Sequence, residues 1–177
     1  MANVFTRQII KDTTEHAVIK LTASFDGSGQ EDNPNRISAN TLYGALNANT
    51  NPGLLSSGGS PLPYYGLNVY RVWYDTTNGA TGDVELYWNA NPVVTLLMLS
   101  GNSEYDGAGN WITIPNTARG TSNANGNIGI QTYGMGALAN SIYNIVIELR
   151  KDNYDYSRGQ DRDPGAFNYG TGHTITP

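Results

Sequence analysis

The stretch Ala17–Phe25 reads AVIKLTASF and alternates between the two faces of an extended chain. One face collects apolar side chains, and the other is largely polar: the first holds Ala17, Ile19, Leu21, Ala23 and Phe25, and the second holds His16, Lys20, Thr22 and Ser24. A period of two is typical of a β-strand with one buried face. The sequence therefore predicts a protein built on β-strands.

Seven further segments have the length and composition of strands. They are Phe5–Lys11, Leu67–Asp75, Asp83–Asn89, Val93–Leu99, Asn110–Pro115, Asn127–Thr132 and Ser141–Lys151. Eight strands at this spacing fit an all-β domain, either a β-sandwich or a jelly roll.

Three of these segments carry more specific expectations. Leu67–Asp75 places Leu67, Val69 and Trp73 on one face and Tyr70, Val72 and Tyr74 on the other, so both of its faces should be covered. Leu67–Asp75 and Asp83–Asn89 are expected to pair as a hairpin across a loop that contains Asn78-Gly79. Val93–Leu99 (VVTLLML) reads as a buried strand.

Glycine and asparagine replace many of the charged residues of an average protein. The chain has 21 of each among 177 residues, and only 14% of its residues are charged. Both types supply turns, which predicts long Asn/Gly-rich loops such as Asn47–Pro63 and Ala118–Gly126. One short helix is expected over Ser38–Leu46, where a serine provides an N-cap. We predict a single β domain over residues 1–151.

Charge and composition argue against several classes of partner. The net charge is −5 and no basic cluster is present, which disfavours nucleic acid. No apolar run reaches the length of a transmembrane helix, and the N-terminus does not resemble a signal peptide, so no membrane partner is expected. The absence of cysteine excludes thiol catalysis and thiolate metal sites.

The sequence does not single out a catalytic group. His16 and His173 lack a carboxylate at a helpful spacing, and the carboxylates Asp83, Glu85, Glu104, Asp106 and Glu148 read better as solvated strand and turn residues. Asp26–Asp32 alternates oxygen ligands but departs from the EF-hand pattern, and Gly134–Ala139 matches a dinucleotide fingerprint without room for its helix. We therefore expect neither an enzyme nor a metal or cofactor site.

The segment 152–177 has an unusual composition for a chain end. Its only aliphatic residue larger than alanine is Ile175, yet it carries four aromatic residues among charges and glycines. Such a segment buries too little apolar surface to fold alone, whereas its rings could anchor on another surface. It is read as an extended C-terminal arm; the alternative is a disordered terminus.

Aromatic residues outside the strands are the best candidates for binding a partner. The candidates in the loop before Leu67 and in the arm, together with one arginine, are Tyr64, Tyr65, Tyr154, Tyr156, Arg158, Phe167 and Tyr169. They could also form a platform for sugars. The strand aromatics Tyr70, Trp73, Tyr74, Tyr87 and Trp88 are expected to pack within the sheets.

Several stretches together resemble small virion structural proteins of tailed phages, particularly those of marine cyanobacteria. These stretches are Phe5–Thr14, His16–Thr22, Phe25–Asp32, Arg36–Asn40, Pro63–Gly66, Arg71–Asp75, Glu148–Asp152 and Pro164–Tyr169. The resemblance implies a structural part of the virion, without catalytic residues.

Three functions remain in view. The first is a capsid decoration or cement protein whose partners are the major capsid protein and neighbouring copies of itself, as a homo-oligomer or in many copies per particle. The alternative is a tail, baseplate or fibre-associated component, with a possible carbohydrate-binding surface. An enzyme such as a glycan hydrolase is the least favoured.

Overall fold

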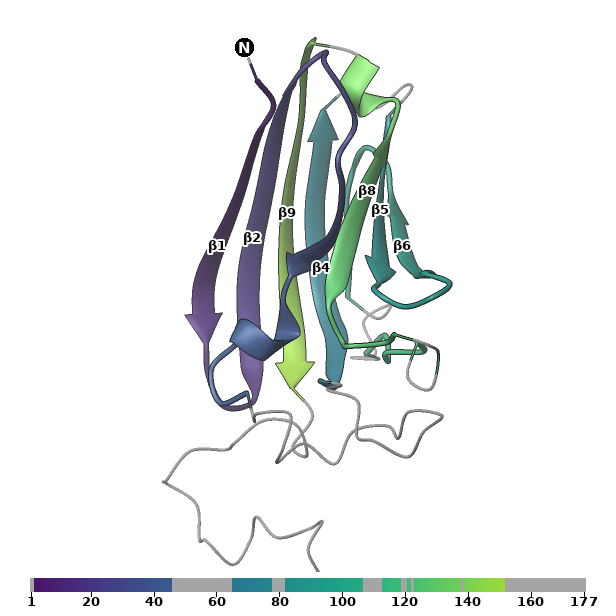
Figure 1. Cartoon of the computed structure of the whole chain (residues 1–177). Helices are drawn as coiled ribbons and strands as arrows, with labels where there is room; N and C mark the ends of the chain where they lie inside the picture. Colours follow the sequence, from purple (N-terminus) through teal and green to yellow (C-terminus); the bar gives the residue numbers. More distant parts are fainter. Residues whose placement is uncertain are drawn as a thin grey trace, which may run out of the picture.

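The computed structural model is a sandwich of two antiparallel sheets (Figure 1). It describes residues 2–45, 65–77, 82–106, 113–118, 121, 123–137 and 139–151. One sheet has five strands in the order β1-β2-β9-β4-β7, and the other has four in the order β3-β8-β5-β6. The all-β prediction is confirmed.

The strands of the five-stranded sheet come from both ends and the middle of the chain. They are β1 (Val4–Asp12), β2 (His16–Asp26), β4 (Leu67–Thr77), β7 (Asn102–Tyr105) and β9 (Ala139–Lys151). The four-stranded sheet consists of β3 (Asp32–Ile37), β5 (Asp83–Trp88), β6 (Val94–Leu99) and β8 (Ile128–Tyr133). Two 3-10 turns, η1 (Ala39–Thr41) and η3 (Met135–Ala137), complete the described elements.

The pairing from β2 to β9 is that of a jelly roll. Antiparallel pairs join β5 to β6, β4 to β7, β3 to β8 and β2 to β9, as if one long hairpin were rolled up across two sheets. Strand β1 adds an extra edge beside β2. The jelly-roll alternative is therefore the one that the strand order supports.

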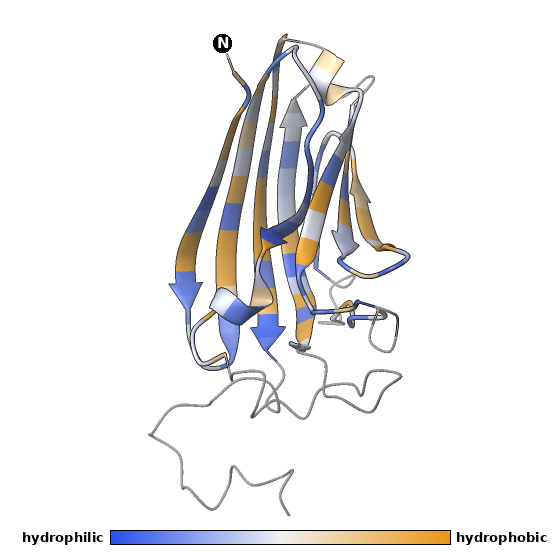
Figure 2. Cartoon of the chain, viewed as in Figure 1, coloured by the Kyte–Doolittle hydropathy of each residue, from blue (hydrophilic) through white to orange (hydrophobic). Residues whose placement is uncertain are grey.

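The core lies between the sheets and follows the alternation seen in the sequence (Figure 2). The apolar face of β2 is buried along its whole length, from Ala17 to Phe25. In the four-stranded sheet, Val84, Leu86 and Trp88 of β5 are also fully or almost fully buried in the same core. At about 25 cal/mol per Å² of apolar surface, this interior is the main source of stability.

Strand β4 corrects one face assignment through a β-bulge. The register against β9 shifts between Val69 and Arg71, which leaves Tyr70 as the extra residue. Because the alternation reverses there, Val72 joins Val69 in the core and Trp73 turns to the outer face. Trp73 therefore does not share the face of Leu67 and Val69.

Two predictions about strand pairing and burial are wrong. Strands β4 and β5 lie in different sheets, so they do not form a hairpin; β5 pairs with β6 and β8 instead. Strand β6 is an edge strand in which only Leu96 and Leu99 are buried, while Met98 is 52% exposed. An apolar run alone does not show whether a second strand covers it.

Other boundaries also differ from the sequence prediction. The helix expected over Ser38–Leu46 is only the 3-10 turn η1, because Leu42 already takes an extended backbone with a ψ of 150°; Gly44 then takes a φ of +76°, which a right-handed helix cannot contain. Of the strand expected over Asn110–Pro115, the described residues show one isolated bridge between Ile114 and Val69. The polar strands β3 and β7 have no apolar alternation, so the sequence did not predict them.

Hydrogen bonds of asparagine side chains join the connections between strands at one end of the sandwich. The Asn127 amide donates to Asn35 Oδ1 at 2.6 Å, and its Oδ1 accepts from the backbone amide of Ala39 at 2.8 Å. The Asn89 amide donates to the same Asn35 oxygen at 3.2 Å. These bonds explain part of the high asparagine content.

Candidate functional site

The structure places one of the predicted partner-binding residues and contradicts its exposure. Tyr65 is only 6% exposed and belongs to the core. Its backbone amide donates to Asn125 O at 3.2 Å, which draws the start of β4 inward. Tyr65 is therefore a packing residue and not an exposed aromatic. The other predicted residues, Tyr64, Tyr154, Tyr156, Arg158, Phe167 and Tyr169, lie outside the described residues.

Strand β1 is the most exposed edge of the sandwich. Eight of its nine residues are exposed, and among the described strands only β2 pairs with it. Four of them are large apolar residues: Val4 is 56% exposed, Phe5 38%, Ile9 41% and Ile10 54%. An edge strand with this composition is a template for association unless something covers it.

The other three edges are less suited to strand addition. Strand β7 has only four residues, and β3 contains Pro34 and pairs with β8 at three positions. Strand β6 has a register irregularity between its partners Leu86 and Tyr87. Proline and bulges disrupt a free edge, and β1 has a register shift of its own between Ile9 and Lys11, but with nine residues it is the longest of the four edge strands. We call the outward edge and side chains of Val4–Asp12 the β1 edge.

Charge at the β1 edge is opposite in sign to that of the whole protein. Arg7 and Lys11 are exposed, whereas the single acid, Asp12, contacts the Lys151 ammonium. The edge thus offers two cations and four apolar side chains on a protein of net charge −5. Such a surface favours a partner that is apolar and neutral or acidic.

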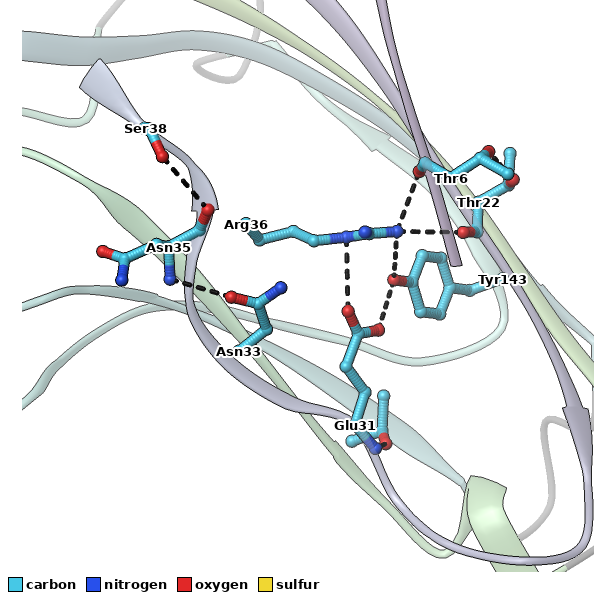
Figure 3. A network of polar contacts seen from close by, with 9 residues as sticks. Thr6, Thr22, Glu31, Asn33, Asn35, Arg36, Ser38 and Tyr143 are labelled. Atoms are coloured by element: carbon cyan, nitrogen blue, oxygen red, sulfur yellow. Dashed lines mark hydrogen bonds and ion pairs between the residues drawn. The ribbon is translucent and has the colours of Figure 1, made fainter. Parts of the chain in front are cut away.

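A buried ion pair fixes the strands beside this edge (Figure 3). Arg36 Nε lies 3.2 Å from Glu31 Oε1, and both residues are buried. The Arg36 Nη2 group donates to the carbonyl oxygens of Thr6 and Thr22 at 2.8 and 3.0 Å. Arg36 therefore links β3 of one sheet to β1 and β2 of the other.

Tyr143 completes the network from β9. Its hydroxyl donates to Glu31 Oε2 and accepts from Arg36 Nη2 at 3.3 Å. Burial raises the pKa of the Glu31 carboxyl, an effect that the Tyr143 hydrogen bond and the Arg36 charge oppose. Burial also raises the pKa of the Tyr143 hydroxyl, with the Glu31 charge acting in the same direction. With these partners the network is a structural clamp.

A second buried cation lies where β9 ends. The side chain of Lys151 donates to Asp12 Oδ1, to the Thr13 carbonyl at 2.7 Å and to the Tyr43 carbonyl at 2.8 Å. Burial lowers the pKa of this ammonium, although Asp12 opposes the change. The last described residue of the chain is thus held beside the end of β1.

Two of the carboxylates considered for catalysis, Glu85 and Glu148, have separate partners. Glu85 accepts hydrogen bonds from Thr95 Oγ1 at 2.6 Å and from the Tyr133 hydroxyl at 2.7 Å. Glu148 lies 3.6 Å from His16 Nδ1, a pairing that the sequence did not suggest because the two residues come from different strands. These contacts define two structural polar clusters.

The oxygen-rich loop Asp26–Asp32 does not converge on one point. Asp26 accepts from the Ser28 backbone amide at 2.9 Å, which is a turn contact. Glu31 faces Arg36, whereas Asp32 accepts from the Tyr87 hydroxyl at 3.2 Å. Within the described residues no group of three or more His, Asp or Glu side chains could hold a metal ion.

The comparisons with known proteins give no family assignment. No family model, no curated protein and no solved structure matches this chain. In the described part of the chain, no helix has both the length and the apolar character to cross a membrane. The β1 edge and the rest of the described surface therefore carry the structural evidence for a function.

Proposed function

We propose that this protein is a structural component of a tailed-phage virion that binds the outside of the capsid and stabilises the shell. The observation that carries the proposal is the β1 edge, a nine-residue edge strand with four exposed large apolar side chains. The sequence resemblance to small virion proteins supports the same role. Fold alone does not, because jelly rolls serve many functions.

The β1 edge offers two kinds of contact to a partner. Its free backbone groups can accept an added strand, and Val4, Phe5, Ile9 and Ile10 can be buried by the partner's side chains. One such contact is modest, but many copies on a shell act together when each also reaches a neighbour. The proposed partners are the major capsid protein and adjacent copies of this chain.

The clamp around Arg36 suits this role. Besides its pairing with β2 and the contact of Asp12 with Lys151, strand β1 has a further anchor in Arg36. Arg36 binds the Thr6 carbonyl on β1 and the Thr22 carbonyl on β2, so the edge is fixed to both sheets before a partner arrives. A preorganised edge loses less conformational entropy on binding.

Copy number in purified virions tests the proposal. Quantitative mass spectrometry should find this protein at an abundance close to that of the major capsid protein. A few copies per particle would contradict the decoration role and favour the tail, baseplate or fibre alternative. Absence from the particle would contradict both.

Binding to particles that lack the protein tests the surface itself. Ile10→Lys should reduce occupancy strongly because it places a charge in the apolar part of the β1 edge. Met98→Lys is the matched control, since Met98 is 52% exposed on β6, a different edge. Equal occupancy for the two variants would show that β1 is not the contact.

A further inference from the structure

A groove lies on the outer face of the five-stranded sheet, where β4 runs between β7 and β9. Its volume is about 440 Å³, within the usual range of roughly 300–1,000 Å³ for small-molecule sites. The lining residues are Trp73, Tyr74, Asp75, Asn102, Ser103, Glu104, Asn144 and Val146. This groove belongs to none of the structural clusters described above.

The strand register arranges its outward side chains in two rows. Trp73 on β4 stands between Glu104 on β7 and Val146 on β9. In the next row, Asp75 stands between Asn102 and Asn144. Paired residues on adjacent strands share a face, at about 4.5–5.5 Å between Cβ atoms. An indole therefore lies beside a row of three planar polar groups.

The β4 bulge is what places the indole there. Without the extra residue Tyr70, strict alternation would put Trp73 on the core side with Val69. With it, Val72 is fully buried and Trp73 is only half-buried on the outer face. The Arg71 guanidinium lies 5.8 Å from the centre of the Trp73 ring and supports it from the neighbouring position.

The polar groups of the groove are available to a ligand. Asp75, Asn102, Glu104 and Asn144 are all exposed. None of these four side chains has a hydrogen-bond partner among the residues that the structure describes. This differs from Glu85 and Glu31, whose oxygens are already occupied by hydroxyl groups.

We propose that this groove binds a neutral oligosaccharide. A sugar ring has an apolar C–H face that can stack on an indole, and hydroxyl groups that both donate to carboxylates and accept from amides. Trp73 supplies the stacking surface, while Asp75 and Asn144 lie one row away at hydrogen-bonding reach of ring hydroxyls. The carboxylates of Asp75 and Glu104 repel uronic acids, sulfated sugars and nucleic acid.

The inference does not depend on the proposed capsid role. A glycan site would serve a head protein or a tail protein that meets carbohydrate on a cell surface. Glycan binding and particle occupancy are separate measurements on separate surfaces. Either result can therefore fail without changing the other.

The test begins with an array of neutral and acidic oligosaccharides and the purified full-length chain. The strongest neutral ligand is then titrated by isothermal calorimetry. Trp73→Ala should weaken binding by about tenfold or more, since an aromatic anchor dominates small contact surfaces. Tyr133→Ala is the matched control, because Tyr133 is an exposed aromatic on the opposite sheet and should leave affinity unchanged.

Variants at two exposed positions, Asn144 and Asp75, should fold normally, so they test the groove itself. Asn144→Ala removes one hydrogen-bonding group and should weaken the same ligand severalfold. Asp75→Asn keeps a planar hydrogen-bonding group and should retain the neutral ligand while it lowers discrimination against acidic sugars.

Three results would overturn the proposal. The first is that no neutral oligosaccharide binds the wild-type chain at millimolar concentration. The second is that acidic glycans bind more tightly than neutral ones. The third is that Trp73→Ala and Asn144→Ala both bind like the wild type.

Discussion

The buried pair of Arg36 and Glu31 shows how one side chain can join three strands. Two charges in an interior cost several kcal/mol each in lost hydration, so such a pair persists when every remaining polar group is bonded. Here the Arg36 guanidinium also binds two backbone carbonyls, and the Glu31 carboxylate also accepts from Tyr143. The pair thus fixes the relative positions of the strands more than it adds to the net stability.

Glu31 gives the protein a pH-dependent contribution to stability. Because burial raises its pKa above the usual 4.5, the folded protein holds this proton more tightly than the unfolded chain. The contribution is therefore present below pH 4.5 and is lost as the pH rises through the native pKa. We expect the free energy of unfolding of the wild type, minus that of Glu31→Gln, to fall as the pH rises from 4.5 through the native pKa of Glu31.

Urea denaturation of both proteins across this range measures the difference. The glutamine variant keeps the shape of the side chain but does not titrate. Subtracting its free energy of unfolding therefore cancels the contributions of all other titrating groups. Parallel pH profiles of the two free energies of unfolding would show that folding does not raise the pKa of Glu31. A difference that grows with pH would show that folding lowers this pKa.

Gly129 on β8 allows a close contact on the outer face of the four-stranded sheet. A Cβ at this position would lie 2.3 Å from the ring of Tyr87, the residue opposite it on β5. Gly129→Ala should therefore destabilise the protein by about 1–3 kcal/mol through overpacking. Gly29→Ala is the control because a Cβ there meets nothing within 4 Å, and it should change stability by less than about 0.5 kcal/mol.

Thermal and urea unfolding of these two glycine variants provide the measurement. Equal stability of Gly129→Ala and Gly29→Ala would mean that the Tyr87 ring can move aside without loss, and that its hydrogen bond to Asp32 does not hold it in place.

At the scale of elements, the sequence predicts most strands but not their partners. Alternation in Ala17–Phe25 gives the correct buried face because β2 is polar on its other side. In β4 both faces are apolar, so the alternation carries no information about the bulge at Tyr70, and Trp73 is assigned to the wrong side. The groove could not be predicted for the same reason.

The exposure of the β1 edge also could not be predicted from the sequence. The sequence predicts a strand over Phe5–Lys11 but does not show whether its apolar side chains are covered. Their exposure follows from the position of β1 outside β2 at the edge of the wider sheet (Figure 1). Strand order is a long-range property, and local patterns do not encode it.

The end of β9 supports a prediction about chain length. Lys151 is 3% exposed, and its ammonium contacts Asp12, Thr13 and Tyr43. A chain that ends at Lys151 should unfold at nearly the same temperature as the full chain. A chain that ends at Arg150 should lose about 1–3 kcal/mol, because the three part-buried hydrogen bonds of the Lys151 side chain are lost with that residue.

Circular dichroism melts of the two truncated chains measure the difference directly. The chain ending at Lys151 is the control for the chain ending at Arg150, since both lack residues 152–177. If both melt together, the Lys151 contacts add nothing to stability; if both melt well below the full chain, the segment after Lys151 contributes to the domain.

At the scale of the whole molecule, two outward surfaces, the β1 edge and the Trp73 groove, are not needed to close the sandwich. The jelly roll is closed by its own pairs from β2 to β9, and β1 is an addition to that scheme. The Trp73 groove lies on the outer face of the same sheet. A domain with a continuous buried core and an apolar added edge strand is suited to binding, which is why a structural role is proposed.

The last prediction concerns the segment 152–177. This segment follows Lys151 in the chain, and the ammonium of Lys151 contacts Asp12 at the end of the β1 edge. Its four aspartates and two arginines give it a net charge of −2, opposite to that of the edge, which carries Arg7 and Lys11. Deletion of residues 152–177 should therefore leave the β domain folded but reduce its occupancy on virions that lack the protein.

Point variants in this segment distinguish apolar anchoring from charge. Phe167→Ala and Tyr169→Ala should lower occupancy more than Arg158→Ala, since buried rings dominate such contacts and exposed ion pairs contribute about 0–1 kcal/mol. Occupancy is measured by quantitative electrophoresis of re-pelleted particles at saturating protein. Full occupancy by the deleted chain would contradict the arm, and a larger loss for Arg158→Ala than for the ring variants would mean that attraction between charges, and not ring burial, holds the protein on the shell.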